Sequence, residues 1–280
     1  MRWQLGRRSD NVEDRRGRGS SGPMMVGGGI GTIILAVVVT LLGGDPRMVF
    51  QGGAPVQDAP VSQSPEEEEL VEFVSVVLAD TEDTWSQLFR EMGATYQEPT
   101  LVLFSGAVDS ACGYAQAAVG PFYCPADRKV YIDLSFYEDL QYRHNAPGDF
   151  AQAYVIAHEV GHHVQNLLGI SGEVHQMKRQ VSKTDANQLS VMLELQADCF
   201  AGVWANRADR QRQILEQGDI EEALNAASSI GDDRLQRKAQ GYVVPDSFTH
   251  GSSQQRVRWF SQGLQTGEIE QCNTFEARNL

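Results

Sequence analysis

The sequence predicts an α+β fold that is mostly helical, contains a small antiparallel sheet and is preceded by one N-terminal transmembrane helix. Three observations predict it. An uncharged apolar run covers residues 24–42, short β-rich segments lie between residues 100 and 133, and helical apolar patterns follow almost to the end. A chain of 280 residues with 41% hydrophobic content is long enough to bury a substantial core.

The N-terminal residues differ in charge from the rest of the chain. The first twenty contain six arginines and three acidic residues, whereas the whole chain has a net charge of −14. Because an acidic body repels phosphate backbones, and no basic patch is interleaved with aromatic residues, we expect no nucleic-acid partner. We interpret residues 1–23 as a basic cytoplasmic segment.

Residues 24–42, "MMVGGGIGTIILAVVVTLL", form an apolar run just long enough to cross a bilayer as a helix. A cleaved signal peptide would have a shorter apolar region and a better cleavage site, and a buried core helix fits poorly with the glycines at 27–29. The arginines precede the run and Asp45 follows it, so the positive-inside rule predicts a single-pass membrane protein. Its N-terminus would be cytoplasmic and its catalytic domain extracytoplasmic, in the periplasm or outside the cell.

Residues 43–63 are rich in Gly, Pro and Gln and predict a flexible linker before a folded domain at residues 64–280. Ser64, a proline and four glutamates predict the start of a long amphipathic helix. "PTLVLF" then predicts a strand, and residues 122–133 predict a hairpin. Capped apolar patterns predict five further helices, at roughly 149–168, 184–206, 219–230, 232–239 and 252–264.

The chain contains four cysteines, an even number that agrees with export to an oxidising compartment. Cys112 and Cys124 bracket a short segment, and a bridge between them would staple that loop. Cys199 and Cys272 would form a second pair, although four cysteines allow three connectivities.

The stretch "AHEVGHHVQ" carries a candidate metal site. His158 and His162 are four residues apart on an apolar helix, so both imidazoles leave the same face and can share one ion. Glu159 follows His158 and so points about 100° further round the helix. It can hold a water beside the metal without binding the ion. This H-E-x-x-H arrangement is typical of zinc hydrolases.

A third ligand comes from "VMLELQADCFAGVWA". Position 168 is a leucine, which excludes the histidine that metzincins place there. Glu194 would complete a shell of two histidines and one carboxylate, with a fourth position open for water. Asp198, one turn later, would accept a hydrogen bond from a ligating histidine, most plausibly His158.

The stretch "SFTHGSSQQRVRWF" supplies two more candidates. His250 would hydrogen-bond the oxyanion of the transition state, and Arg256 would anchor its turn through a carboxylate such as Asp198. Tyr123 or Tyr131 on the hairpin are alternative donors.

These motifs resemble those of the YpfJ-type neutral zinc metallopeptidases. The resemblance rests on "MRWQLGRRSDNVEDRRG", "CGYAQAAVGPFYCPADRKVYID", "HEVGHHVQ", "ELQADCFAGVWA" and "THGSSQQRVRWF", and so covers nearly the whole chain. It implies a membrane-anchored, gluzincin-like zincin whose sheet edge receives the substrate backbone. It also supports His250 and Arg256, since HtpX-like and CAAX prenyl endopeptidases are similar at H-x-x-x-x-x-R, although Ser252 stands where those proteins commonly have proline.

The sequence therefore predicts a membrane-anchored metallopeptidase, an endopeptidase with one Zn²⁺ per chain, that hydrolyses peptide bonds with a metal-activated water. The alternative is a membrane-tethered, non-catalytic binding or assembly protein with a structural zinc. A closed shell completed by His163 or His175 would favour this alternative. The physiological substrate and the oligomeric state stay open.

Overall fold

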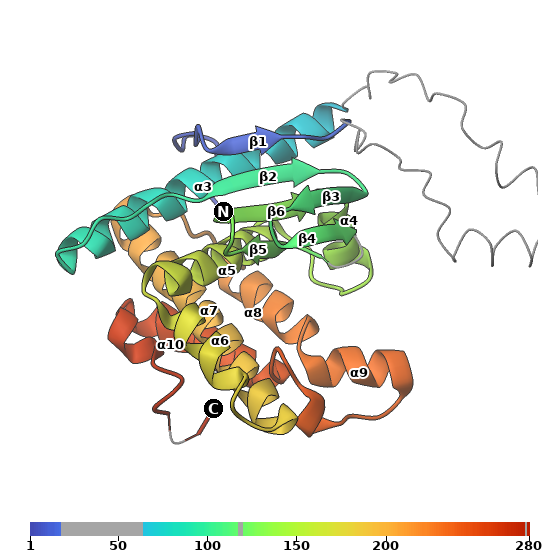
Figure 1. Ribbon diagram of the computed structural model, residues 1–280. Helices are drawn as coiled ribbons and strands as arrows, with labels where there is room; N and C mark the ends of the chain where they lie inside the picture. The colour runs from blue at the N-terminus through green and yellow to red at the C-terminus, as the bar shows by residue number, and fades with distance from the viewer. Residues whose placement is uncertain (18–63, 117–119, 278) are drawn as a thin grey trace, which may run out of the picture. The chain divides into compact units, whose positions relative to one another are not determined.

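The computed structural model describes residues 1–17, 64–116, 120–277 and 279–280, and it confirms a mostly helical fold with a small sheet (Figure 1). The predicted transmembrane helix at 24–42 and the linker at 43–63 lie outside the described residues. Within the described ranges, no helix is both long and apolar enough to cross a membrane.

Eight helices and six strands make up the described part of the chain. The helices are α3 (Pro65–Glu91), α4 (Ser135–Tyr142), α5 (Asp149–Leu167), α6 (Ile170–Lys178), α7 (Lys183–Arg212), α8 (Asp219–Ser229), α9 (Asp232–Gln240) and α10 (Ser253–Thr266). The strands are β1 (Val12–Asp14), β2 (Thr100–Phe104), β3 (Ala107–Ser110), β4 (Gly113–Gln116), β5 (Phe122–Cys124) and β6 (Lys129–Asp133).

Two of the described helices begin at a capping box. Ser64 caps α3 in a capping box with Glu67, as the sequence predicts, and Ser252 caps α10 in the same way with Gln255. The predicted helices at 149–168, 219–230, 232–239 and 252–264 are present with nearly the predicted bounds, whereas α7 extends further than predicted. Helices α4 and α6 were not predicted.

The main sheet is mixed, so the prediction of an antiparallel sheet is wrong in part. Its strand order is β1-β2-β6-β5, with β1 parallel to β2 and β2 parallel to β6. Only the predicted hairpin of β5 and β6 is antiparallel within this sheet, and β3 pairs with β4 in a separate antiparallel ribbon. Four of the five residues are buried in both β2 and β6, and such strands carry no alternating pattern that would reveal their direction.

The N-terminal residues belong to the folded domain. Residues Met1–Arg16 form one compact unit with Gln63–Leu280, because β1 pairs with β2 and Trp3 is buried against Phe73. The domain therefore does not begin at residue 64. Arg7, one of the arginines that precede the apolar run, donates to Glu82 on α3.

Helix α5 lies at the centre of this unit, beside β5 and β6 on one side and α7 on the other (Figure 1). Most of its residues are buried, including Phe150, which stacks on Trp204 of α7 with ring centroids 5.8 Å apart. This packing holds the polar face of α5 against α7, where the candidate metal ligands lie.

Both predicted disulfides are confirmed. Cys112 and Cys124 join the β3–β4 ribbon to β5 with a Cα separation of 5.8 Å. Cys199 and Cys272 join α7 to the C-terminal segment with a Cα separation of 5.6 Å, and both are fully buried.

Candidate metal centre

Two helices bring the three predicted ligands together. His158 and His162 lie one turn apart on α5, and Glu194 faces them from α7. Glu194 Oε2 lies 3.2 Å from His158 Nε2, and Glu194 Oε1 lies 3.5 Å from His162 Nε2. One ligand atom from each residue falls within 4.8 Å of the others, and no fourth His, Cys, Asp or Glu of the described residues joins this group.

These distances fit a zinc ion. Zn–N and Zn–O bonds of about 2.1 Å in a tetrahedron place neighbouring ligand atoms roughly 3.4 Å apart. The Nδ1 atoms, which point away from Glu194, are also placed as in a zinc site. His158 Nδ1 lies 2.8 Å from Asp198 Oδ1, and His162 Nδ1 lies 2.9 Å from Gln165 Oε1. Each Nδ1 faces a hydrogen-bond acceptor, and both Nε2 atoms face Glu194, which is the orientation that would let them bind a metal.

The charges of the site favour a cation between the three side chains. Burial alone would lower the pKa of His158, but the carboxylates of Asp198 and Glu194 outweigh it and raise that pKa to about 9. Burial opposes ionisation of Glu194, yet the two imidazoles hold its pKa well below the usual range. In the absence of a metal ion, a proton on His158 thus supplies positive charge beside the carboxylate of Glu194, where a metal ion would lie.

Glu159 lies next to the ligands but is not one of them. Only 8% of the residue is exposed, and burial raises the pKa of its carboxyl. A buried carboxylate with a raised pKa, beside a metal site, is suited to accept a proton from water.

Asp198 links the metal site to α10. It has no exposed surface, and Arg256 donates to both of its oxygens over 2.8 Å. Tyr154 also donates to Asp198. The sequence predicts the Asp198 contacts with His158 and Arg256, but it missed Tyr154, although that residue lies one turn before His158 on the same face of α5.

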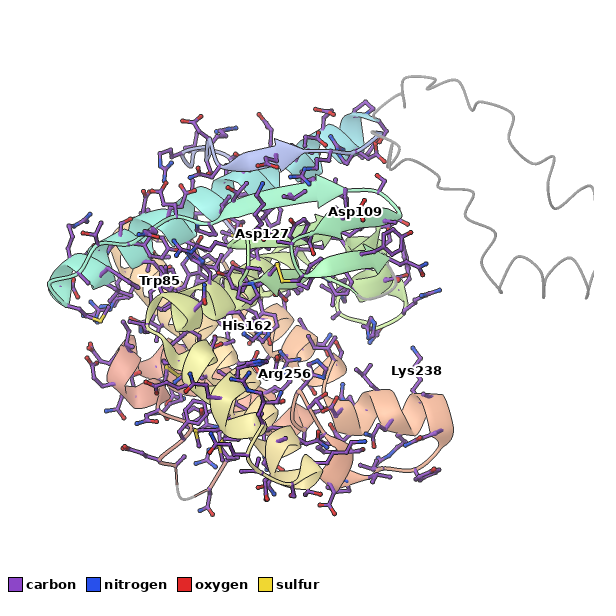
Figure 2. All side chains as sticks on the ribbon, in the orientation of Figure 1. Trp85, Asp109, Asp127, His162, Lys238 and Arg256 are labelled. Carbon is purple, nitrogen blue, oxygen red and sulfur yellow. A yellow bond between two sulfur atoms is a disulfide. The ribbon has the colours of Figure 1, made fainter. Side chains whose placement is uncertain are left out.

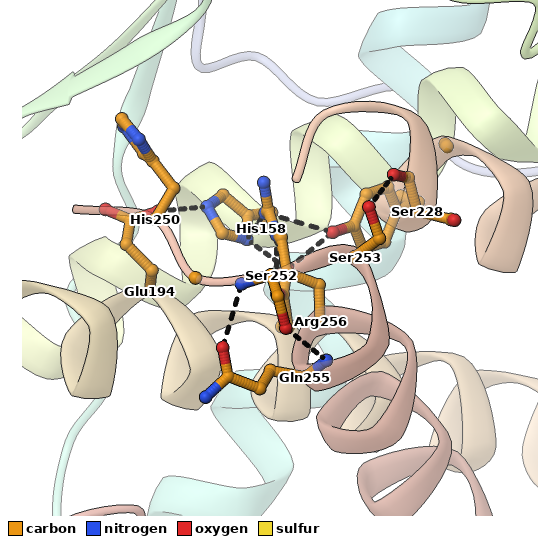
Figure 3. Close-up of polar contacts among 12 residues, drawn as sticks. His158, Glu194, Ser228, His250, Ser252, Ser253, Gln255 and Arg256 are labelled. Atoms are coloured by element: carbon orange, nitrogen blue, oxygen red, sulfur yellow. Dashed lines mark hydrogen bonds and ion pairs between the residues drawn. The ribbon is translucent and has the colours of Figure 1, made fainter. Parts of the chain in front are cut away.

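His250 lies at the rim of the site in a turn that Asp232 holds. Asp232 Oδ2 accepts from the backbone N–H groups of Thr249, His250 and Gly251, and Asp232 Oδ1 lies 3.2 Å from His250 Nδ1. Figure 3 shows His158 between Glu194 and Arg256, with His250 on the side of Glu194. Asp232 was not predicted, because its partner turn follows eighteen residues later in the chain.

The three ligands line a cavity of about 730 Å³ that is also lined by Glu159, His250 and Arg256. Phe122 and Tyr123 of β5 contribute to the same cavity. In Figure 2, His162 lies between Asp127, in the turn that joins β5 to β6, and Arg256 of α10.

Neither tyrosine that we considered as an oxyanion donor is free. Tyr123 Oη donates to His163 Nδ1 over 3.0 Å and accepts from Asn166, and Tyr131 donates to Asp127. His163 in turn donates to the carbonyl oxygen of Gln97. His163 therefore ties the edge strand β5 to α5 and is not placed to bind the metal.

A second group of carboxylates, Asp149, Asp219 and Glu222, lies at the start of α5 and α8. The Met1 ammonium lies 2.6 Å from Asp149 and 3.4 Å from Asp219. Because a cation already occupies this group, we do not assign a metal to it.

Comparison with known proteins agrees with this geometry. A family model described as "Putative neutral zinc metallopeptidase" matches residues 1–275. The chain is 55% identical over 285 residues to the uncharacterized protein YpfJ of Escherichia coli (strain K12), covering 98% of this chain and 99% of that protein. It is 41% identical over 218 residues to the uncharacterized protein Rv2575 of Mycobacterium tuberculosis (strain ATCC 25618 / H37Rv), covering 74% and 73%. No solved structure is significantly similar to the chain.

Proposed function

Because the chain belongs to the neutral zinc metallopeptidase family, we propose that it hydrolyses peptide bonds with one zinc ion bound by His158, His162 and Glu194. The observation that carries this proposal is the three-ligand group in a cavity, with the buried carboxylate of Glu159 beside it. Three protein ligands leave a coordination position for water, as in catalytic zinc sites.

Zinc at this site would lower the pKa of a water molecule and polarise the carbonyl of the scissile bond. Glu159 accepts the proton of the attacking water and then delivers it to the leaving nitrogen. His250 donates a hydrogen bond to the carbonyl oxygen as negative charge develops there. Asp198 and Arg256 keep His158 in the correct tautomer and orientation.

The substrate backbone binds along β5. This strand is the last in the order β1-β2-β6-β5, so one of its sides makes no pairing within the described sheets. Phe122 and Tyr123 of β5 line the cavity that holds the metal ligands. An extended peptide added to this edge would place its carbonyl groups in the cavity.

A structural zinc would need a fourth protein ligand. His163 is engaged by Tyr123 and Gln97, and His175 is exposed on α6. Neither joins the three ligands, which supports the catalytic over the structural alternative.

The apolar run at residues 24–42 supports attachment of the protein to a membrane. The disulfides Cys112–Cys124 and Cys199–Cys272 support an oxidising, extracytoplasmic compartment for the folded domain.

The first test measures zinc content and casein cleavage by the purified full chain. We expect one zinc per chain and cleavage that a chelator abolishes. Glu194→Ala should lose the zinc, and Glu159→Gln should keep the zinc but lose cleavage by at least about a hundredfold, because it removes the general base. Cleavage by Glu159→Gln at the wild-type rate would refute the mechanism, and zinc without any cleavage would support the non-catalytic alternative.

A further inference from the structure

The cavity is also lined by side chains that the proposed reaction does not use. Lys178, the last residue of α6, and Ser190 of α7 are two of them. Both are half-buried, and Lys178 Nζ donates to Ser190 Oγ over 2.5 Å. The ammonium group of Lys178 is therefore held at a defined place in the cavity wall.

That place is close to the metal site. Ser190 precedes the metal ligand Glu194 by four residues on α7, so the two side chains leave the same face of the helix, roughly 6 Å apart along its axis. An extended peptide covers such a distance in about two residues. A substrate that places its scissile bond at the metal can thus reach Lys178 with a group near that bond.

Lys178 differs from the other cations of the cavity in its charge environment. Within the described part of the chain it makes no ion pair with a carboxylate, although the protein has 37 acidic and only 23 basic residues. An ammonium has three N–H donors, and Ser190 accepts from one of them. Each of the other cationic side chains has a carboxylate partner: Arg143 with Asp139, His250 with Asp232, and Arg256 with Asp198.

We propose that Lys178 and Ser190 form a subsite for a carboxylate group of the peptide substrate. This inference rests on the proposed function and adds a substrate class to it. The carboxylate belongs either to an Asp or Glu side chain close to the scissile bond or to the C-terminus of the peptide. In both cases the ammonium donates charge-assisted hydrogen bonds to the carboxylate oxygens.

The test measures peptide binding to the zinc-loaded full chain carrying Glu159→Gln, by fluorescence anisotropy. Labelled polyalanine peptides carry a single Glu, Gln or Lys that is moved through successive positions. Each peptide is made with a free and with an amidated C-terminus, so that the two sources of the carboxylate are separated.

We expect the Glu peptide to bind about tenfold more tightly than the Gln peptide at one position, or the free C-terminus to bind about tenfold more tightly than the amide. Adding Lys178→Met should bring that ratio close to one, Lys178→Arg should retain most of it, and Lys178→Glu should favour the Lys peptide. The control is Lys183→Met, which makes the same change of charge at an exposed lysine outside the cavity.

Two results would overturn the subsite: no preference for a carboxylate in the parent protein, or a preference that Lys178→Met leaves intact. Since Glu159→Gln removes the general base, these binding ratios do not depend on hydrolysis. A Lys178-dependent preference in a chain that cleaves no peptide would therefore refute the peptidase function while the carboxylate subsite stands.

Discussion

Asp198 contacts three other side chains of the candidate site. It is fully buried and meets a ligand histidine, a tyrosine and an arginine, so its charge is balanced only by groups inside the protein. Its pKa is about 2: burial opposes ionisation, but the guanidinium of Arg256 and the imidazole of His158 outweigh that effect. Asp198 is therefore ionised whenever the domain is folded near neutral pH.

We expect Asp198→Asn to weaken zinc binding by about 10- to 100-fold, because it removes the carboxylate that orients His158. It should also lower the free energy of unfolding by about 3–5 kcal/mol, since the buried charge of Arg256 loses its partner. Competition with a metal-binding dye measures the first effect, and urea unfolding measures the second.

Tyr154→Phe is the matched control for this variant, because it removes one hydrogen bond to the same carboxylate without a change of charge. It should cost about 1 kcal/mol of stability. Wild-type zinc affinity in Asp198→Asn would show that the carboxylate does not orient the ligand.

If His250 takes part in the proposed reaction, we expect the activity to depend on pH. The hydrogen bond that His250 donates to Asp232 raises the pKa of His250 above 6.5, although partial burial opposes the shift. The imidazolium is the main form below the raised pKa, and it is lost as the pH rises through that value. A neutral ring keeps its single proton on Nδ1, facing Asp232, and then has no Nε2 donor for the substrate oxygen.

We therefore expect Asp232→Asn to move the pKa of His250 back towards 6.5 and to shift the alkaline limb of kcat/KM to lower pH. The contribution of the His250–Asp232 pair to stability is likewise lost at high pH, since the folded pKa is the higher one. Proton NMR of the six histidines measures the pKa directly. An unchanged alkaline limb in a protein whose His250 pKa has fallen would exclude His250 from the reaction.

Local spacing predicts which side chains come together at the candidate metal site, but it does not predict the residues that hold the rest of the cavity in place. His158, His162, Glu194 and Asp198 follow from i, i+4 pairs on two apolar helices, which fix shared faces before any tertiary structure is known. Asp232 and Lys178 could not be found in this way, because the residues they contact are brought near only by packing of separate helices.

At the scale of elements, α7 and α10 cross at two glycines. A Cβ atom on Gly263 would lie 1.9 Å from the carbonyl oxygen of Cys199, and one on Gly202 would lie 2.1 Å from that of Phe260. These close backbone contacts bring Arg256 of α10 to Asp198 of α7.

We expect Gly263→Ala to cost about 3 kcal/mol or more, because the helices must separate to admit the methyl group. Zinc affinity should fall with it, as Arg256 is drawn away from Asp198. Gly172→Ala on α6 is the control, since nothing lies within 4 Å of its added Cβ, and it should gain up to about 1 kcal/mol. Thermal unfolding compares the two, and equal melting temperatures would contradict the close crossing.

Helices were more predictable than the sheet for a physical reason. Capping residues and apolar periodicity are local, and they locate α3, α5 and α10 closely. Pairing of β1 with β2 joins residues 12–14 to 101–103, and no local signal in "NVEDRR" marks such a partner. The β5–β6 hairpin was predictable because its turn joins the two strands directly.

At the scale of the whole molecule, the position of β1 constrains the membrane topology. Strand β1 precedes the apolar run at 24–42 and β2 follows it, yet the two strands are hydrogen-bonded neighbours. A single crossing would separate them by a hydrocarbon layer of about 30 Å. Pairing of β1 with β2 and the predicted single crossing therefore exclude each other.

We expect both flanks of the apolar run to lie on the same side of the membrane. Leu5→Cys and Tyr242→Cys each place a thiol on an exposed residue, one before and one after the run. A membrane-impermeant maleimide should label both in intact cells or neither, and cell lysis provides the control for reactivity. Labelling of only one site in intact cells would show a single crossing and would mean that β1 does not pair with β2 in the cell.

The place of β1 in the sheet also means that β1 is synthesised well before the residues that it contacts. The ribosome makes residues 1–16 first, but Val12 of β1 has to wait for Leu101 of β2, and Met1 has to wait for Asp219. At synthesis rates of roughly 5–20 residues per second, the wait of Met1 for Asp219 is on the order of 10–40 s. The N-terminal residues are therefore held without their partners while the apolar run emerges, and the sheet can be completed only after β6, which ends at Asp133, has left the ribosome.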